Sequence, residues 1–293
     1  MRVTPMRPDG TKTRGMTAIT RAIPHIMPRR YDAQNFITEY ADMEILNAYT
    51  RLVRRTKGIR ISHMALIIAA YYKTALRFPY INRFIMNRTC YDRNHFCVSF
   101  VILKRRADGT PDETPCKIFL EPGDDLFSIN QKVDDIIKLN QIPVVRNNTD
   151  KFVDWLCSVP GLMRVVIGLA YRLDQWGLLP RRIIDLSPFH TSLFITNLAS
   201  INTGAIYHHI YEFGTTGIFV SMGKPIPNYL SGDINTKLIP LAFVLDERIC
   251  TGNEYARVWQ AFRRYLRRPE LLEGAFDRTA APDEGEDTIP DRA

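Results

Sequence analysis

The segment 62–78, SHMALIIAAYYKTALRF, is apolar around almost its whole circumference up to Lys73. A helix that is hydrophobic on every side has to be buried inside a protein. Ser62 is a suitable N-cap for this helix, and Pro79 ends it. The chain has 293 residues, of which 45% are hydrophobic, so it can form one large domain or two ordinary ones with a core that encloses the helix.

Helices and strands alternate irregularly along the rest of the chain. Residues 95–105 and 116–122 predict a hairpin, because both are rich in strand-forming residues and a polar turn with Gly and Pro separates them. The pattern favours a two-layer α+β fold with antiparallel strands over regular βαβ winding. The other predicted helices are 42–55, with Asp42 as N-cap, 125–139 and 252–272, and the other predicted strands are 192–200, 217–223 and 238–246.

The two ends of the chain differ from its middle in composition. Residues 1–20 are polar and contain Gly, Pro and Thr, so we expect a loose N-terminal segment, and they lack the apolar stretch of a signal peptide. From Glu273 onward the chain is acidic and poor in large apolar residues, so we expect 273–293 to be a disordered tail. The folded domain is therefore predicted to span residues 21–272.

Charge and cysteine content limit the classes of ligand. The formal net charge is +8 and the isoelectric point about 9.3. The basic residues are spread along the chain without interleaved aromatic residues, so we do not expect nucleic-acid binding, whereas an anionic small ligand suits the charge. The five cysteines form no CxxC pair and no zinc-type spacing with histidine, so we expect reduced, buried thiols in a cytoplasmic protein and no metal.

Residues 152–179, FVDWLCSVPGLMRVVIGLAYRLDQWGLL, belong to an apolar helical insertion at about 150–185. Arg164, Arg172 and Asp174 interrupt the apolar run, which argues against a transmembrane helix. Two interpretations stay open. The insertion packs on its own domain or a neighbouring subunit, or it is a membrane-surface or partner-docking helix.

The stretch 240–252, PLAFVLDERICTG, raises the main functional question. Its apolar run ends abruptly at Asp246, Glu247 and Arg248, before Gly252. A strand that ends in a cluster of charge usually places that charge at a particular point of the fold. Glu247 is therefore a candidate site residue.

Four stretches, in this order, carry a family resemblance: 63–85 with its P-x-x-N turn, 192–201 with FITNL, 217–225, and 237–252 with ERICTG. Together they resemble the chloramphenicol acetyltransferase-like fold family, which includes the catalytic domain of the 2-oxo acid dehydrogenase acyltransferases (dihydrolipoamide acyltransferases). The resemblance covers about Arg21 to Leu272. It implies a mixed, largely antiparallel sheet flanked by helices, a homotrimer or higher assembly, and coenzyme A or acyl-CoA bound in tunnels between subunits. No counterpart of the family's lipoyl module precedes the domain, so we expect a stand-alone protein.

The sequence departs from the family at the catalytic signature H-x-x-x-D-G. The family's histidine falls on Glu247 and its aspartate on Thr251, whereas Gly252 is kept. The family's oxyanion-stabilising serine falls on Thr196, which keeps a hydroxyl group. Asn197 of the same motif is a further candidate site residue.

These replacements change the chemistry that the resemblance implies. An imidazole accepts and returns a proton near pH 7, whereas Glu247 serves as a base only if burial raises its pKa. The alternative is a strand-end carboxylate paired with a basic neighbour. In the family, the aspartate pairs with an arginine near the start of the domain, so Arg29 or Arg30 would lack that partner. His208 and His209 are either structural or surface residues, or one of them is a displaced base.

Three functions remain open from the sequence. The first is CoA-dependent acyl transfer with an altered site, in which Glu247 is the base and Thr196 the oxyanion donor. The second is a catalytically inactive trimeric scaffold or acyl-CoA-binding module. The third is a peripheral membrane or partner-binding protein that makes its contact through 152–179. We expect a cytoplasmic location, with peripheral attachment to the membrane in the third case.

Overall fold

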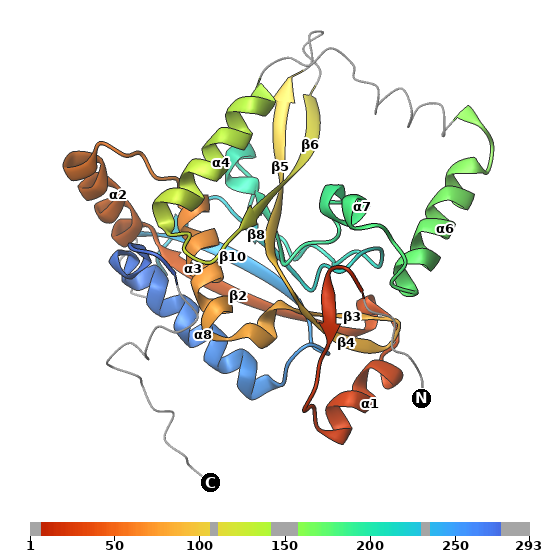
Figure 1. Ribbon diagram of the computed structural model, residues 1–293. Helices are drawn as coiled ribbons and strands as arrows, with labels where there is room; N and C mark the ends of the chain where they lie inside the picture. The colour runs from red at the N-terminus through yellow and green to blue at the C-terminus, as the bar shows by residue number, and fades with distance from the viewer. Residues whose placement is uncertain (1–6, 106–110, 142–157, 230–234, 277–293) are drawn as a thin grey trace.

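A computed structural model describes residues 7–105, 111–141, 158–229 and 235–276. A mixed sheet of seven strands forms the centre of this described part, in the order β2-β10-β8-β7-β5-β6 with β9 beside β10 (Figure 1). The pairs β5–β7 and β7–β8 are parallel and the others are antiparallel, which confirms the predicted α+β fold with a mixed, largely antiparallel sheet. The strands are β2 (Gln34–Asp42), β5 (Phe96–Arg105), β6 (Pro111–Leu120), β7 (Leu193–Asn197), β8 (Ile218–Met222), β9 (Ile226–Pro227) and β10 (Lys237–Asp246).

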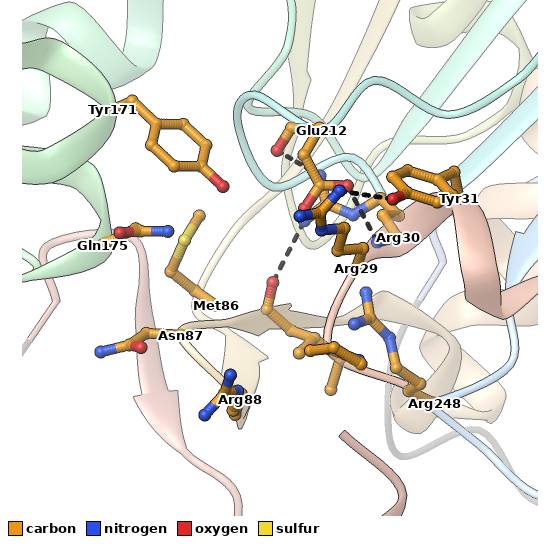
Figure 2. A pocket seen from close by; sticks show the side chains of 12 residues that line it. Arg29, Arg30, Tyr31, Met86, Asn87, Arg88, Tyr171, Gln175, Glu212 and Arg248 are labelled. Atoms are coloured by element: carbon orange, nitrogen blue, oxygen red, sulfur yellow. Dashed lines mark hydrogen bonds between the residues drawn. The ribbon is translucent and has the colours of Figure 1, made fainter. Parts of the chain in front are cut away.

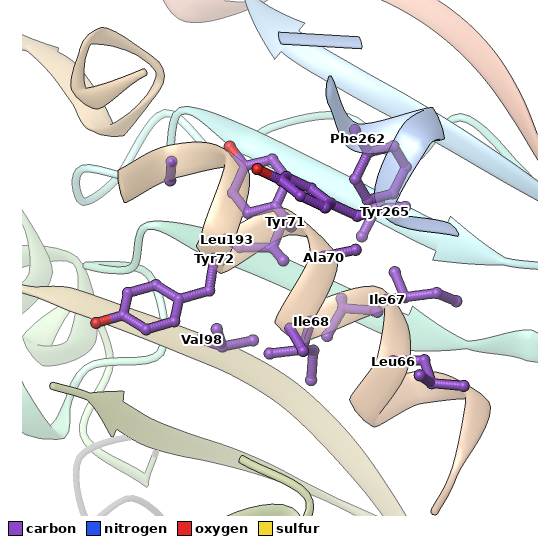
Figure 3. Close-up of a cluster of buried hydrophobic side chains, with 14 of the residues drawn as sticks. Leu66, Ile67, Ile68, Ala70, Tyr71, Tyr72, Val98, Leu193, Phe262 and Tyr265 are labelled. Atoms are coloured by element: carbon purple, nitrogen blue, oxygen red, sulfur yellow. The ribbon is translucent and has the colours of Figure 1, made fainter. Parts of the chain in front are cut away.

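Helices cover one face of this sheet (Figure 1). The apolar helix that the sequence requires to be buried is α3, and twelve of its fifteen residues are buried. In Figure 3, Ile68 of α3 lies near Val98 and Leu193 of the sheet, and Tyr71 lies near Phe262. Truncating one such side chain to alanine typically costs about 2–5 kcal/mol, so this layer carries much of the stability. The covering helices are α2 (Met43–Lys57), α3 (His63–Arg77), α4 (Leu126–Gln141) and α8 (Gly252–Arg267).

The predicted starts of two helices are confirmed by their N-caps, whereas the predicted helix 252–272 is shorter, because α8 ends at Arg267. The Asp42 carboxylate accepts the backbone N–H of Glu44 at 2.8 Å, and the Ser62 hydroxyl accepts that of Ala65 at 3.1 Å. Pro79 starts the short helix η2 (Pro79–Asn82) directly after α3. Four cysteines are buried free thiols, as predicted, and Cys157 lies outside the described residues; the four are Cys90, Cys97, Cys116 and Cys250.

Residues 7–20 are part of the fold, unlike the loose segment that the composition suggests. Strand β1 (Gly10–Lys12) pairs with β4 (Thr89–Arg93) in a small antiparallel sheet that β3 (Arg83–Met86) completes, and α1 (Ala18–Ile26) follows. The reason is tertiary, because the buried side chain of Arg7 pairs with Asp9 and also with Asp174, far along the chain. Composition does not reveal such a contact.

The start of the predicted acidic tail also belongs to the fold. Phe276 is buried and its ring lies 6.0 Å from that of Tyr72. Glu273 accepts hydrogen bonds from Tyr49 at 2.9 Å and from Lys57 at 2.5 Å. These contacts follow the last short helix, η4 (Pro269–Leu272). Residues 277–293 lie outside the described part of the chain.

The opposite face of the sheet is covered differently, by short elements and by coil. The segment 202–216 crosses it between η3 (Leu198–Ile201) and β8, and α7 (Arg181–Leu186) lies nearby (Figure 1). The Phe194 and Phe219 rings stack on this face with centroids 4.7 Å apart. Other large side chains of this face remain exposed, namely Phe36, Tyr40 and Leu103.

The predicted insertion forms helix α6 (Leu162–Gln175), which extends away from the sheet in Figure 1. Of its residues only Asp174 is buried, so packing on its own domain is confined to the end of the helix. Residues 150–157 of the predicted insertion lie outside the described residues. Within the described ranges, every helix is too short or too polar to span a membrane.

Candidate functional site

The charged end of β10 splits into two environments. Asp246 is fully buried. Arg248 donates a hydrogen bond to each of its carboxylate oxygens, from Nε to Oδ1 and from Nη2 to Oδ2, both at 2.7 Å. Arg30 approaches the same carboxylate, with Nε 3.6 Å from Oδ2. Arg30 thus has no carboxylate partner at position 251, and Asp246 takes that place instead.

Burial and charge act against each other in this cluster. Burial lowers the pKa of the Arg30 guanidinium below its usual value, although the charge of Asp246 opposes this. Burial alone would also lower the pKa of Arg248, but its hydrogen bonds and ion pair with Asp246 outweigh burial and raise it. Arg30 further donates to the backbone carbonyls of Ile85 and Gly214, each at 3.1 Å. The cluster thus ties β10 to the small sheet and to the 202–216 segment.

Glu247 is the first residue after β10 and lies outside this cluster. Its backbone N–H donates to the carbonyl of Ala33 at 2.9 Å, and its side chain is half-buried. Within the described residues its carboxylate makes no hydrogen bond or ion pair. The alternative of a carboxylate paired with its basic neighbour is not what the structure has, because Arg248 binds Asp246 instead.

Thr251 starts α8 and does not brace Glu247. Its hydroxyl accepts the backbone N–H of Glu254 at 3.4 Å, while the Glu254 carboxylate accepts the N–H of Thr251 at 2.6 Å. This reciprocal capping box satisfies two backbone donors at the helix start. The residue at the family's aspartate position therefore has a local role in helix capping.

Thr196 and Asn197 close strand β7, at the other end of the sheet from Glu247. Thr196 lies opposite Ser221 of β8, which lies opposite Ala242 of β10. Ala242 precedes Glu247 by five residues, which corresponds to about 16 Å at about 3.3 Å per residue. One chain therefore does not bring Thr196 and Glu247 together.

The side chains at this end of β7 are only partly satisfied. The Thr196 hydroxyl is half-buried and makes no hydrogen bond within the described ranges. The Oδ1 atom of Asn197 is buried without a hydrogen-bond partner in the described part of the chain. A buried polar atom without a hydrogen-bond partner is energetically costly in a folded protein.

His208 and His209 lie on the 202–216 segment, over the same sheet face as Thr196. The His208 ring stacks on Phe219 with centroids 4.1 Å apart, and its Nδ1 lies 2.9 Å from the carbonyl oxygen of His209. His209 is exposed. No hydrogen bond joins either imidazole to Thr196 among the residues that the structure describes.

A pocket of about 640 Å³ lies beside the Arg30 cluster, and the sequence did not predict it (Figure 2). Residues 28–31, the turn of the β3–β4 hairpin and α6 contribute its walls. The paired arginines of the sequence HIMPRRYDA were its only sequence signal. Four of its lining residues carry guanidinium groups, namely Arg29, Arg30, Arg88 and Arg248.

A buried charged cluster fixes the end of α6 to the body, and the sequence did not predict this cluster either. Asp174 accepts from Arg7 Nη2 at 2.7 Å and lies 3.0 Å from His190 Nε2. Burial alone would raise the pKa of Asp174, but the hydrogen bond and charge of His190, together with those of Arg7, outweigh burial and lower it. The buried side chain of His190 is thus part of the hydrogen-bond network that holds Asp174.

Of the comparisons with known proteins, the one with solved structures supports the fold. No family model matches the sequence, and no curated protein has a significantly similar sequence. Among solved structures, a probable dihydrolipoamide acetyltransferase from Listeria monocytogenes has a TM-score of 0.54 and 13% identity, over 92% of this chain and 99% of that one. The cubic core of a pyruvate dehydrogenase multienzyme complex has a TM-score of 0.54 and 13% identity, over 89% of this chain and 93% of that one. A chloramphenicol acetyltransferase has a TM-score of 0.51 and 11% identity, over 87% of this chain and 100% of that one.

Proposed function

Because the chain has the chloramphenicol acetyltransferase-like fold in the form of the dihydrolipoamide acetyltransferases, we propose that it is a CoA-dependent acyltransferase with an altered site. In this proposal the sites form between subunits of a trimer or higher assembly. The observation that carries the proposal is the placement of Thr196 and Glu247. Each is half-buried and unpaired within the described residues, and the two lie at opposite ends of one sheet, so only two chains together can make one site.

The proposed step assigns one role to each side chain. Glu247 of one chain accepts the proton from the hydroxyl or thiol of the acyl acceptor as that atom attacks the thioester carbonyl carbon. The carbonyl oxygen becomes an oxyanion, to which the Thr196 hydroxyl of the neighbouring chain donates a hydrogen bond. The carbon–sulfur bond then breaks, and the departing CoA sulfur takes the proton from Glu247.

A glutamate carboxylate can act as this base near neutral pH only if its pKa is raised. The ordinary pKa of glutamate is about 4.3, and burial in an apolar site can raise it by several units. Glu247 is only half-buried in one chain. A second subunit that covers it would supply the missing desolvation, and the exposed side chains Phe36, Tyr40 and Leu103 offer that subunit an apolar surface on the same side of the sheet as Thr196.

An inactive trimeric scaffold or acyl-CoA-binding module is the second candidate. It is favoured by the lack of any described residue that orients Glu247 as a base, since Thr251 and Arg248 are committed elsewhere. Both candidates predict an oligomer, which light scattering during size-exclusion chromatography would measure. A monomer at micromolar concentration would contradict both.

Turnover separates the two candidates. Chromatography measures the consumption of acetyl-CoA, with dihydrolipoamide or chloramphenicol as the acyl acceptor. An active enzyme loses most of its rate in Glu247→Gln and Thr196→Val but keeps much of it in Thr196→Ser, which retains the hydroxyl. No turnover by the wild type, together with a gain in Glu247→His, would establish the inactive scaffold.

The exposed surface of α6 and α7 supports a contact outside the proposed reaction site, and we assign it to an anionic membrane surface. Of the twenty large apolar side chains exposed in the described ranges, eight lie within residues 159–186, so this is the main apolar surface. Arg164, Arg172 and Arg182 are exposed beside them. Of the two acidic residues in this stretch, Asp174 is buried and Asp185 pairs with Arg181 at 2.7 Å. A basic and apolar surface fits anionic headgroups.

Vesicle binding tests this assignment without removing the helix. Wild-type protein should co-sediment with vesicles that contain anionic phospholipid and less with neutral ones. The double variant Leu169→Ser/Leu178→Ser should lose this binding, whereas the control Leu52→Ser, an equally exposed leucine on α2, should keep it. No binding by the wild type would exclude the membrane. A smaller oligomer for the double variant would assign the surface to a second copy of the chain.

A further inference from the structure

The arginine-lined pocket beside α6 contains none of the proposed catalytic residues. Figure 2 shows Tyr171 and Gln175 of α6 on one side, and Arg29 with Tyr31 on the other. Neither Thr196 nor Glu247 lines it. The pocket is therefore separate from the residues proposed for acyl transfer.

The four guanidinium groups of the pocket are not equally available. Arg30 and Arg248 are buried and committed to backbone carbonyls and to Asp246. Arg29 is exposed and uses Nη1 for the Tyr31 hydroxyl, at 2.5 Å, which leaves its other N–H groups available. Arg88 is exposed and has no hydrogen bond or ion pair in the described part of the chain.

The acidic groups near the pocket do not balance these charges. Glu212 is the one carboxylate of the lining, and it accepts the backbone N–H of Arg30 at 2.9 Å. Asp246 lies behind the wall and is shared by two arginines, and Asp32 is close enough to act on Arg29 and Arg248. Four guanidinium groups thus face three carboxylates, and only one of those carboxylates lines the space.

The backbone at Arg88 is a second, independent observation. Asn87 and Arg88 form the two-residue turn between β3 and β4, with φ values of 46° and 58°. A two-residue hairpin turn with both φ values positive strongly prefers the pair Asn-Gly. Asn87 fits this preference, whereas Arg88 occupies the glycine position and has to adopt a left-handed conformation that is unfavourable for its side chain. A residue kept in such a conformation points to a role beyond the turn.

We propose that this pocket binds a small, multiply charged oxyanion, a phosphate or dicarboxylate, through Arg88 and Arg29. Guanidinium groups bind such oxygens with two parallel hydrogen bonds, which are stronger than neutral ones. The Tyr171 hydroxyl and the Gln175 amide make no hydrogen bond within the described residues and supply further donors. The ligand lies against the one part of α6 that is fixed to the body by Asp174.

The substitution Arg88→Gly tests the proposal because its effects on folding and binding have opposite directions. Glycine relieves the turn, so the midpoint of thermal unfolding should stay the same or rise. Binding of pyrophosphate or succinate, measured by calorimetry at constant ionic strength, should weaken at least about tenfold, which corresponds to the loss of one charge-assisted pair. Saturation by pyrophosphate alone identifies a phosphate site, and saturation by succinate alone a dicarboxylate site.

Two further variants keep the test decisive. Arg29→Ala changes an exposed side chain on the other wall and should weaken binding as well. Arg51→Ala removes the same charge from an exposed position on α2, outside the pocket, and should leave the affinity unchanged. The proposal is overturned if neither probe saturates the wild type, if Arg88→Gly and Arg29→Ala bind as the wild type does, or if Arg51→Ala weakens binding equally.

Discussion

Asp246 and Glu247 are neighbours in the sequence and opposites in the structure. Asp246 is buried between Arg30 and Arg248, and every described interaction of its carboxylate is with an arginine side chain or with the backbone next to it. Glu247 is half-buried, and its carboxylate has no partner in the described ranges. The comparison teaches that one acidic residue of the pair holds the fold together, while the other is left available for a ligand or a second subunit.

The same contrast recurs elsewhere in the chain. Asp174, with Arg7 and His190, holds the end of α6 in the way that Asp246 holds the end of β10. Thr196 and Asn197, like Glu247, have polar atoms without partners in the described part of the chain. The polar residues that stabilise the fold therefore differ from those with a proposed function. Substitutions at the two kinds of residue can test this distinction.

The largest expected effect is on Asp246. Asp246→Asn keeps the shape of the side chain but leaves two buried guanidinium groups without an anion, and we expect unfolding to become easier by about 3–5 kcal/mol. Urea denaturation measures the change. The control is Asp185→Asn, which breaks an ion pair whose side chains are 38% and 35% exposed, and its expected cost is at most about 1 kcal/mol. Equal losses in both variants would contradict the assigned role of the buried cluster.

A smaller effect, dependent on pH, is expected at Asp174. Its lowered pKa means that the carboxylate contributes its full stability above the unfolded pKa of about 3.9 and loses it as the pH falls through the lower folded value. Asp174→Asn should cost about 1.5–3 kcal/mol at neutral pH, because Arg7 keeps Asp9 as a partner.

Denaturation curves of the wild type and Asp174→Asn between about pH 3 and pH 7 measure this effect. The wild type should lose stability more steeply than the variant below about pH 4, so the two curves should converge there. Parallel curves over the whole range would show that the Asp174 carboxylate does not contribute as an ion.

The smallest effect on stability is expected at Glu247. Glu247→Gln removes a charge that has no described partner, so the free energy of unfolding should change by no more than about 0.5 kcal/mol. The same variant is expected to lose turnover if the proposed base is correct. A loss of stability as large as that of Asp246→Asn would instead make Glu247 a structural residue, and the contrast between the two neighbours would fail.

The sequence was sufficient where the signal is local. The apolar circumference of 62–78, the cap residues Asp42 and Ser62, and the strand-forming residues of the predicted hairpin each act on residues close in the chain. The helix, its caps and the pairing of β5 with β6 are confirmed, although β6 begins at Pro111 and not at residue 116. Residues 7–20 were misjudged because Arg7 is held by Asp174, which is 167 residues away. The partner of Arg30 could not be predicted for the same reason, since Thr251 offers no carboxylate and the fold supplies one from Asp246.

The α+β fold around a buried helix, and the unusual acidic residue after the last strand, can both be read from the amino-acid sequence. Hydrophobic periodicity, turn residues and helix caps decide these features, and each of these signals depends only on residues that are close together in the chain. Only the tertiary structure decided that Thr196 and Glu247 lie at opposite ends of the sheet, that Asp246 and not Glu247 is held by arginines, and that a pocket opens beside Arg88. Strand order and register set these distances, and they arise from packing between segments far apart in the chain.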